Sequence, residues 1–345
     1  MPNSACPLSV IIPTFNRLQK LKNALQSLQS QTRPAESFEI IVVDDGSTDE
    51  TLEWLAKAVE EIPNLRVLTQ EHAGPAAARN LAASIALGEV LLFIGDDITA
   101  SEHLVEAHLR VFERMGHNLA VQGGFQLAAS VPRTRFVRYL ADKSAAQSQL
   151  NDARPGGALP LGVFYTSNCS VPKKLLQESG GFPTDVVYYD DTYVGWKLQK
   201  MGASIIYEPR AEAFHNHTQT LDEFLIRQKQ AGKDAAVLSS RHPELRTLLR
   251  VDQTVLFEGA ASDIVKKLTK RVLFNRLTVP ILKWAVKSRF VPFSLACFIF
   301  SGLIGHEHRV AAKKVQSPKS KVEDRRRPAR PNPPPSPASR LVPRL

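Results

Sequence analysis

The sequence predicts an α/β protein with a mainly parallel sheet that is flanked by helices. Short apolar runs alternate with stretches of helical spacing over the first hundred residues, and three of the four runs stop at a Pro or at a cluster of Asp and Gly. Strand–helix–strand alternation of this kind is typical of parallel sheets covered on both faces. With 345 residues and 43% hydrophobic residues, the chain can bury a sizeable core.

The elements of the first hundred residues follow in a regular order. Four apolar runs have the length and composition of buried strands. Between them, apolar residues three or four apart mark one face of a helix. The third helix opens with Gly-Pro and closes on Gly88, as capped helices do. The expected strands are 8–13, 39–43, 65–68 and 90–94, and the expected helices are 18–28, 49–60 and 74–88.

The pattern is weaker in the second hundred residues. Helical spacing recurs at 102–115 and 190–202, and ASIIYEP (203–209) predicts a strand. Residues 170–182 predict a short strand, a helix and a Gly-Gly turn. Residues 140–160 are polar and contain Gly and Pro, which is typical of a mobile loop. The α/β character therefore extends to about residue 210.

The positive charge is concentrated in the C-terminal quarter. Residues 263–345 hold nineteen Lys and Arg against four Asp and Glu, whereas the preceding residues are mildly acidic. This distribution argues against nucleic acid as a partner and favours a basic segment that binds an anionic surface. The three cysteines are far apart, which argues against a disulfide framework. We expect no secretory signal peptide, because a basic segment followed by an apolar stretch is missing at the N-terminus.

Composition divides the chain into three parts. Residues 1–250 form the expected main domain, and residues 251–310 mix basic and apolar residues and predict a helical extension. Within it, the uncharged stretch 290–305 is sixteen residues long. A membrane span needs about 20, so this stretch predicts either a segment in a membrane interface or a packed core helix. Residues 311–345 are rich in Lys, Arg, Pro and Ser, which predicts a disordered tail.

Polar side chains follow three of the predicted strands. Thr14–Asn16 follow the first strand, Asp44–Asp45 the second and Asp96–Asp97 the fourth. Ligands of open parallel sheets bind beyond the carboxyl ends of the strands, so we expect these three groups on one rim. Gly and Asp are also common turn formers. For EVLLFIGDDITA (89–100) alone, an acidic turn is the simpler interpretation.

Four motifs in this order resemble the family 2 glycosyltransferases of the GT-A fold. The resemblance extends over about residues 7–218; each motif alone is weak, and the combination is specific. It implies a Rossmann-like GT-A domain that binds a nucleotide-diphosphate sugar. The motifs are SVIIPTFNR (9–17), EIIVVDDGSTDET (39–51), GPAAARNLAASIALGEVLLFIGDDI (74–98), and GGFPTDVVYYDDTYVGWKLQKMGASIIYEP followed by AFHNH (180–217).

The resemblance implies a nucleotide pocket at the ends of the first two strands. Asp45 is expected to contact the base, and Asp44 stands beside it. The alternative is a turn that caps the next helix, with Ser47 or Asp49 as the N-cap residue, and both interpretations can hold at once. The nucleotide-binding residues implied are Pro13, Thr14, Asn16, Asp44 and Asp45.

Arg79 follows Pro75 by four residues and resembles an arginine that the family places near the nucleotide. A guanidinium there can form a bidentate contact with a phosphate. A surface salt bridge is the alternative.

The resemblance also implies Mg²⁺ or Mn²⁺ at the end of the fourth strand. A divalent ion stabilises the charge on a departing nucleoside diphosphate, and Mg²⁺ usually takes only one or two carboxylates. Asp97 is the expected ligand, and Asp96 is expected to reach the ribose or the sugar. Many family members carry Asp-x-Asp here, and Gly95 at the first position predicts a weaker hold on the ion. His215 is expected to complete the site, with His217 on the same face as the alternative.

Asp190 and Asp191 stand where the family has a Glu-Asp pair at the start of an acceptor-side helix. Inverting transfer needs a carboxylate that takes the proton of the acceptor hydroxyl. Asp191 matches that base, and Asp190 replaces the Glu beside it. The alternative is a helix N-terminus that favours acids because of its dipole. Trp196, one turn later, is expected to pack in the core rather than to stack on a sugar.

Together these expectations describe an inverting, metal-dependent glycosyltransferase that transfers sugar from a nucleotide-diphosphate donor to a hydroxyl of a glycan or a lipid-linked acceptor. The Gln-x-x-Arg-Trp signature of processive synthases does not follow, so we expect non-processive transfer. The expected location is cytoplasmic, with peripheral attachment to the inner face of an anionic membrane through the C-terminal region. Two alternatives stay open: a nucleotide-sugar-binding protein that lost catalysis with Gly95, and a nucleotidyltransferase. The first strand is not followed by the Gly-rich phosphate loop that the latter needs.

Overall fold

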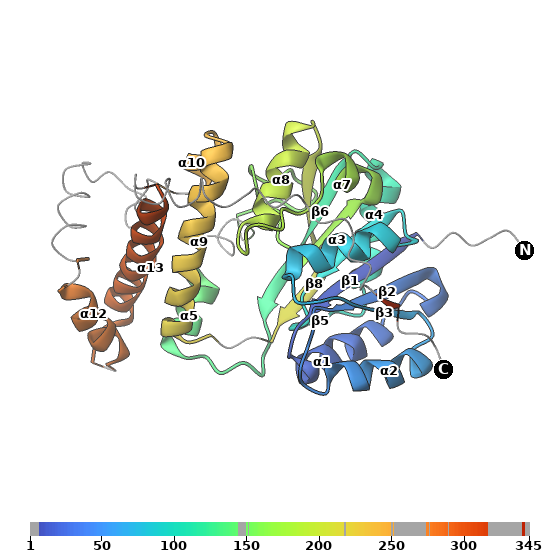
Figure 1. Cartoon of the computed structure of the whole chain (residues 1–345), viewed down its shortest axis with the longest axis horizontal. Coiled ribbons are helices and arrows are strands. Elements are labelled where there is room, and N and C mark those ends of the chain that lie inside the picture. The colour runs from blue at the N-terminus through green and yellow to red at the C-terminus, as the bar shows by residue number, and fades with distance from the viewer. Residues whose placement is uncertain are drawn as a thin grey trace, which may run out of the picture.

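A central sheet covered by helices on both faces organises the computed structural model (Figure 1). The model describes residues 7–143, 150, 152–216, 219–249, 251, 274–275, 277–288, 290–316 and 340–341. Within them, nine strands pair in the order β5-β8-β6-β7-β4-β1-β2-β3-β9. The strands are β1 (Leu8–Thr14), β2 (Phe38–Asp44), β3 (Leu65–Thr69), β4 (Val90–Ile94), β5 (Ile98–Ala100), β6 (Leu119–Leu127), β7 (Asn168–Pro172), β8 (Ser204–His215) and β9 (Arg340–Leu341).

The helices alternate with the strands up to β8, and the helices that follow β8 form the C-terminal part. They are α1 (Leu18–Gln29), the short 3₁₀ helix η1 (Ala35–Ser37), α2 (Thr51–Glu61), α3 (Pro75–Ile85), α4 (Leu104–Met115), α5 (Arg135–Lys143), α7 (Lys173–Ser179), α8 (Asp190–Lys200), α9 (Leu221–Arg241), α10 (Leu245–Leu248), α12 (Thr278–Lys287) and α13 (Phe293–Val315).

The predicted α/β architecture is confirmed. β1 pairs in parallel with β2 and β4, β2 pairs in parallel with β3, and β6 pairs in parallel with β8. β7 runs antiparallel between β4 and β6, and β5 runs antiparallel to β8. The sequence pattern did not predict β5, which has only three residues, or β6, whose apolar run is interrupted by Gln122 and two glycines.

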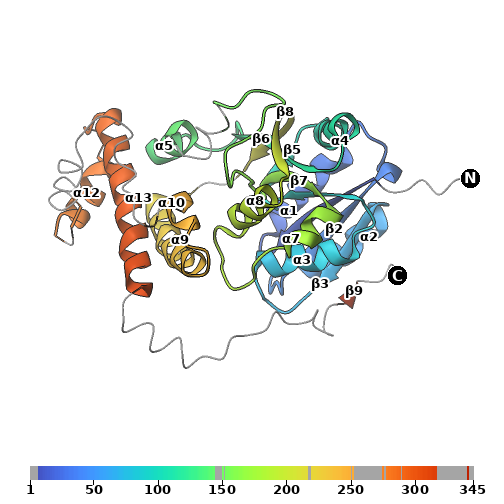
Figure 2. The same ribbon diagram turned by 90° about the horizontal axis from the view of Figure 1, so that it is seen from above.

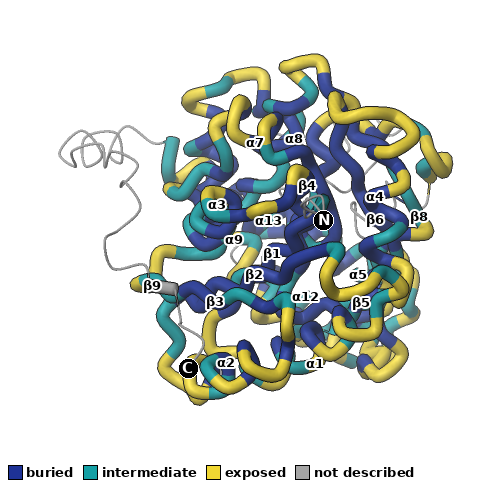
Figure 3. Tube along the Cα trace, turned by 90° about the vertical axis from the view of Figure 1, so that its right-hand side faces the viewer, coloured by how far each residue is buried: buried dark blue, intermediate teal, exposed yellow. Residues whose placement is uncertain are grey.

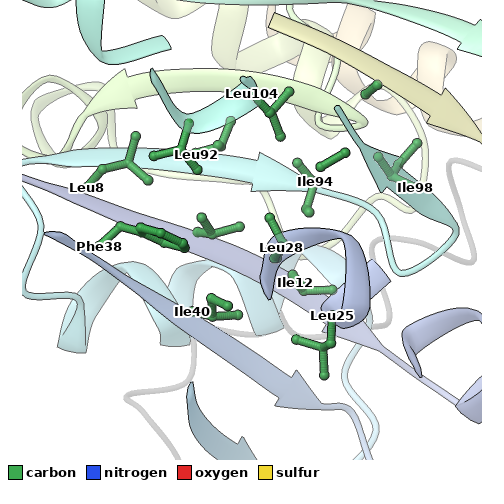
Figure 4. Packing of buried hydrophobic residues seen from close by; sticks show 14 of the residues in the cluster. Leu8, Ile12, Leu25, Leu28, Phe38, Ile40, Leu92, Ile94, Ile98 and Leu104 are labelled. Carbon is green, nitrogen blue, oxygen red and sulfur yellow. The ribbon is translucent and has the colours of Figure 1, made fainter. Parts of the chain in front are cut away.

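Two apolar layers hold the sheet between its helices. Alternation along β1 places Val10 and Ile12 in the layer under α1, α2 and α4, whereas Ile11 lies in the layer under α3, α7 and α8. Figure 4 shows Ile12 meeting Leu25 and Leu28 of α1. The strands are buried in the centre of the molecule and the outer turns of the helices are exposed (Figure 3). The sheet is therefore a rigid frame whose strand ends carry the polar groups.

The C-terminal helices form a layer beside the part that contains the sheet. Within this layer, α13 packs along α9 (Figure 2). Of the two forms predicted for residues 290–305, the structure has the packed helix, because Ala296, Ile299, Phe300 and Leu303 of α13 are buried. None of the described helices is long and apolar enough to span a bilayer.

The predicted boundaries are described only in part. α13 continues to Val315, past the predicted tail boundary at residue 310, and Arg340–Leu341 pair with β3. The rest of the predicted tail lies outside the described residues, as do 144–149 and 151 of the predicted loop 140–160. The division into three parts stays a prediction.

Candidate functional site

The strand ends meet at one rim, as the sequence predicted. The register of β1 and β2 sets Thr14 beside Asp44, and the N–H of Asp45 donates to the carbonyl oxygen of Thr14 at 2.9 Å. Thr14 Oγ1 donates to Asp96 Oδ2 at 3.0 Å. The ends of β4, β1 and β2, which are neighbours in the sheet, are therefore joined by hydrogen bonds. Pro13 is the second-last residue of β1.

An arginine neutralises the acid pair after β4. Arg17 Nη1 lies 3.0 Å from Asp96 Oδ1 and 3.5 Å from Asp97 Oδ2. Burial raises the pKa of Asp96, and the Arg17 charge opposes that rise. Burial alone would lower the pKa of Arg17, but the two carboxylates raise it. Sequence reasoning missed Arg17, although it closes the PTFNR motif three residues after Thr14.

Asp97 and His215 face each other because β5 pairs with β8. The pairing sets Ile98 opposite His215, and the N–H of Asn216 donates to the carbonyl oxygen of Asp97 at 2.8 Å. His215 Nε2 lies 3.8 Å from Asp97 Oδ1. Two ligands that are each about 2.1 Å from one ion lie about 3–4 Å apart. This pair therefore fits a divalent ion.

The protonation state of His215 also suits a metal ligand. Burial lowers its pKa, which favours the neutral imidazole that binds metals. The described residues hold no group of three or more His, Cys, Asp or Glu that could bind a metal. The remaining ligands would have to come from donor phosphates and water, as is usual for Mg²⁺. His217 lies outside the described residues.

The carboxylate of Asp45 organises the loop before α3. Its Oδ1 accepts from the Gln70 side chain at 2.6 Å and from the N–H of Ala73 at 2.9 Å. Its Oδ2 accepts from the N–H of Gly74 at 2.9 Å and lies 2.9 Å from His72 Nδ1. A carboxylate offers about four lone pairs, so a nucleotide base would have to displace one of these groups. The base contact of Asp45 stays a prediction.

Asp44 is less fully bonded than its neighbour. Its Oδ2 accepts from the N–H of Ser47 at 3.2 Å, and its Oδ1 is buried without a hydrogen-bond partner among the described residues. Burial raises its pKa. Close by, the rings of Phe15 and His72 stack with centroids 4.2 Å apart. Sequence reasoning missed this aromatic pair, because the two residues are far apart in the chain.

Asn16 holds the turn that precedes α2. Its φ of 52° is left-handed, and its Oδ1 accepts from the N–H of Thr48 at 2.7 Å and of Asp49 at 3.3 Å. The predicted N-cap is wrong, because the N-cap residue is Glu50 and has no side-chain cap bond. Asp49 accepts from the N–H of Thr51 instead, at 3.1 Å. The turn is thus held both by Asn16, two residues after β1, and by its own Asp49.

The third acid pair, Asp190 and Asp191, begins α8, and Asp190 is paired with Arg79. Arg79 Nη1 lies 2.7 Å from Asp190 Oδ2, and the two side chains are only 11% and 8% exposed. The predicted alternative of a salt bridge is therefore present, but it is buried and not on the surface. The phosphate contact of Arg79 stays a prediction. Trp196 is buried against Tyr193 and His242, which confirms its predicted packing role.

Asp191, the second acid of α8, contacts the segment that leads into β7. It accepts from the N–H of Thr166 at 3.4 Å, and Thr166 comes two residues before β7, which pairs with the end of β4. The guanidinium of Arg227 lowers the pKa of both Asp191 and His215, so the same cation is within electrostatic reach of both. Burial raises the pKa of Asp191. A carboxylate with a raised pKa beside a ligand site is suited to act as a general base.

This mixed sheet, with acid pairs at its strand ends and a third acid pair at the start of a helix, has the GT-A fold. Residues 9–144 match the model of glycosyl transferase family 2.

Three similar proteins illustrate the range of the likeness. The uncharacterised glycosyltransferase YfnE of Bacillus subtilis is 29% identical over 239 residues, which are 56% of this chain and 60% of YfnE. The poly(ribitol-phosphate) beta-glucosyltransferase of Bacillus spizizenii is 42% identical over 101 residues, 28% of this chain and 16% of that protein. The chain therefore spans only part of both relatives. The structure of the mannosyltransferase PcManGT from Pyrobaculum calidifontis, in complex with GDP-Man and Mn²⁺, shares the fold with a TM-score of 0.61 and 19% identity, covering 90% of this chain and 88% of that one.

Replacing Arg79 by Met should destabilise the protein by about 3–5 kcal/mol, because it leaves the buried Asp190 carboxylate without its cation. The loss should be smaller at pH 5 than at pH 7.5, since burial already raises the pKa of Asp190 and protonation removes the unpaired charge. Urea unfolding of wild type and variant at both pH values measures the difference in the free energy of unfolding. The matched control is Arg110→Met, which breaks an exposed pair with Glu106 and should cost less than about 1 kcal/mol. Equal stability of Arg79→Met and wild type would contradict the structural importance of the pair.

Proposed function

We propose that this chain is an inverting, metal-dependent glycosyltransferase that moves one sugar from a nucleotide-diphosphate donor to a hydroxyl acceptor. The observation that carries the proposal is the convergence of two different acidic sites on one rim. Asp97 and His215 are spaced as ligands of one ion. Asp191, whose pKa is raised by burial, is hydrogen-bonded to Thr166 just before β7, the strand that pairs with the end of β4. The match of residues 9–144 to the glycosyl transferase family 2 model supports the reaction class.

The proposed reaction is a single displacement at the anomeric carbon. The acceptor oxygen forms a bond to that carbon while the bond from the carbon to the diphosphate oxygen breaks, and the nucleoside diphosphate leaves with the electron pair. Asp191 accepts the proton of the acceptor hydroxyl. A divalent ion held by Asp97 and His215 would stabilise the negative charge on the leaving group. Arg17, already beside Asp97, is placed to contact the same phosphates.

The similar proteins support the classes of donor and acceptor. PcManGT was determined with GDP-Man and Mn²⁺, which supports a nucleotide sugar and a divalent ion here. Between the two predicted ions we propose Mn²⁺, because Mg²⁺ prefers oxygen ligands and His215 supplies a nitrogen. The relative in Bacillus spizizenii is named for poly(ribitol-phosphate), a polymer that bears hydroxyl groups. This supports a glycan-like acceptor.

Asp191→Asn should lower the rate of transfer by about 10²–10⁴-fold, the usual contribution of a general base. Donor binding should be kept, because the base contacts the acceptor. A thermal-shift screen of UDP-, GDP- and dTDP-sugars with and without Mn²⁺ first identifies the donor, since a ligand of the native state raises the melting temperature.

Transfer by wild type should increase with pH through the raised pKa of Asp191, because only the carboxylate accepts a proton.

Asp152→Asn is the control for this test, because Asp152 is an exposed acid on a different loop. It should transfer at the wild-type rate. Full activity of Asp191→Asn would contradict the role of the base, and a wild-type protein that binds a donor without transferring it would favour the alternative of a degenerate binding protein.

We also propose that α12 docks the protein on an anionic membrane surface. Leu277, Ile281 and Trp284 fall on one face at helical spacing and are 83%, 64% and 76% exposed, and Phe290 is exposed next to them. An exposed apolar face of this kind marks an interaction site, and Trp is favoured at membrane interfaces. The sequence around it, residues 263–290, holds eight Lys and Arg against one Asp. Figure 1 places α12 at the end of the molecule away from the sheet.

Wild-type protein should float with liposomes in which about 30% of the lipid is phosphatidylglycerol. This fraction of anionic lipid gives the liposomes a strong negative surface potential. The double variant Ile281→Glu/Trp284→Glu should lose at least about tenfold in partitioning, because burial of each side chain is worth about 1.5–3 kcal/mol. Leu87→Glu is the matched control, since Leu87 is 68% exposed on the sheet-bearing domain. Equal flotation of the double variant, or equal binding of wild type to uncharged liposomes, would contradict the proposal.

A further inference from the structure

The segment that leads into Asp190 and Asp191 is attached to the C-terminal helices. Residues 185–189 form neither helix nor strand. At the start of the segment, Asp185 makes an ion pair with Arg241 of α9. Val186 is buried in an apolar cluster that includes Ala235 of α9 and Ala312 of α13. The position of the acid pair therefore depends on helices that lie outside the matched family region.

Asp234 of α9 binds the backbone of this segment. Its Oδ2 accepts the N–H groups of Val187 at 3.0 Å and Tyr188 at 2.9 Å, and its Oδ1 accepts from the Gln230 side chain at 2.8 Å. The carboxylate is buried, and burying a charge is costly unless it is hydrogen-bonded. Bonds from N–H groups to a carboxylate are among the stronger hydrogen bonds in proteins. Asp234 thus fixes two successive peptide groups just before the acids.

Tyr189 makes the turn into α8 in an unusual conformation. Its φ is 66°, a left-handed value that is uncommon for residues other than glycine. Such conformations persist where the surrounding structure determines them. Here the hydroxyl of Tyr189 is hydrogen-bonded to His308 Nε2 of α13 at 3.1 Å, and the two rings meet edge to face.

A glycine lets α13 come close enough for this contact. A Cβ atom at Gly232 of α9 would lie 2.1 Å from the carbonyl oxygen of His308, so only glycine fits at that crossing. The two helices pack along much of their length. The sequence of α9 therefore sets the approach of α13, and α13 carries His308 to Tyr189.

We infer that Asp234 and the Tyr189–His308 pair are positioning residues for the acids of α8. Through residues 185–189 they determine where the carboxylates of Asp190 and Asp191 stand relative to the acceptor. This inference rests on the proposed role of Asp191 as the base. It makes the C-terminal helices a part of the active site, in addition to the membrane contact proposed for α12.

Asp234→Asn is the first test, because it removes the charge and keeps the shape. Hydrogen exchange should become at least about tenfold faster at the amides of Val187 and Tyr188, while exchange at Asp97 and Ile98 should stay the same. The kcat for transfer should fall about tenfold or more, since a small displacement of a catalytic group is costly. The affinity for the nucleotide sugar identified by the thermal-shift screen should stay within about twofold, because the donor residues are on other strands.

Tyr189→Phe is the second test and keeps the ring. It should lower kcat with little change in donor affinity, and adding His308→Phe should cause little further loss, because both substitutions remove the same hydrogen bond. Two independent, additive losses would contradict the coupling. This pair of variants also keeps the inference testable if Asp234→Asn folds poorly.

Lys233→Gln is the control, because Lys233 is exposed on α9 next to Asp234. It should leave both exchange and kcat unchanged. Faster exchange in Asp234→Asn with an unchanged kcat would overturn the inference and leave the proposed function intact. A wild-type protein that transfers no sugar would instead overturn the proposed function, and the inference with it.

Discussion

Parallel strands bring carboxylates of like charge together at their carboxyl ends, and the site depends on how each of these carboxylates is neutralised. Burial without a partner would be costly for any of them. Asp45 is surrounded by donors from the loop before α3, Asp96 and Asp97 share Arg17, and Asp190 is paired with the buried Arg79. The charge of Asp45 is stabilised by hydrogen-bond donors, that of Asp96 and Asp97 by an exposed arginine, and that of Asp190 by a largely buried arginine. Carboxylates of the same chemical type therefore have different environments.

The two arginines differ in the way that the proposed reaction requires. The side chain of Arg17 is 44% exposed and it shares its charge between two acids, so it can move toward donor phosphates when an ion takes its place beside Asp97. Arg79 is buried and bonded to Asp190, and the segment before Asp190 is fixed by Asp234 and His308. The proposed donor side of the site is thus adjustable, whereas the proposed acceptor side is held in place.

Sequence patterns predicted the elements that have a local periodicity and missed the contacts between residues far apart in the chain. The strand–helix alternation predicted β1 to β4, and parallel topology then predicted that Thr14, Asp44 and Asp96 meet at one rim. The three-residue strand β5 has no periodicity to detect, yet its pairing with β8 is what brings Asp97 to His215. The Arg79–Asp190 pair joins residues that are 111 positions apart, and such a contact leaves no mark in a local pattern. The same holds for the contacts of α9 and α13 with the segment before the acids.

The most direct test of whether Asp97 and His215 bind the ion is a crystal structure with Mn²⁺ and the donor nucleotide. It needs anomalous diffraction data at the manganese edge. We predict one manganese peak within coordination distance of Asp97 and His215, with the Arg17 guanidinium moved from Asp97 to the phosphates. A manganese ion bound elsewhere on the chain, or nucleotide bound at the rim with no metal between Asp97 and His215, would contradict it.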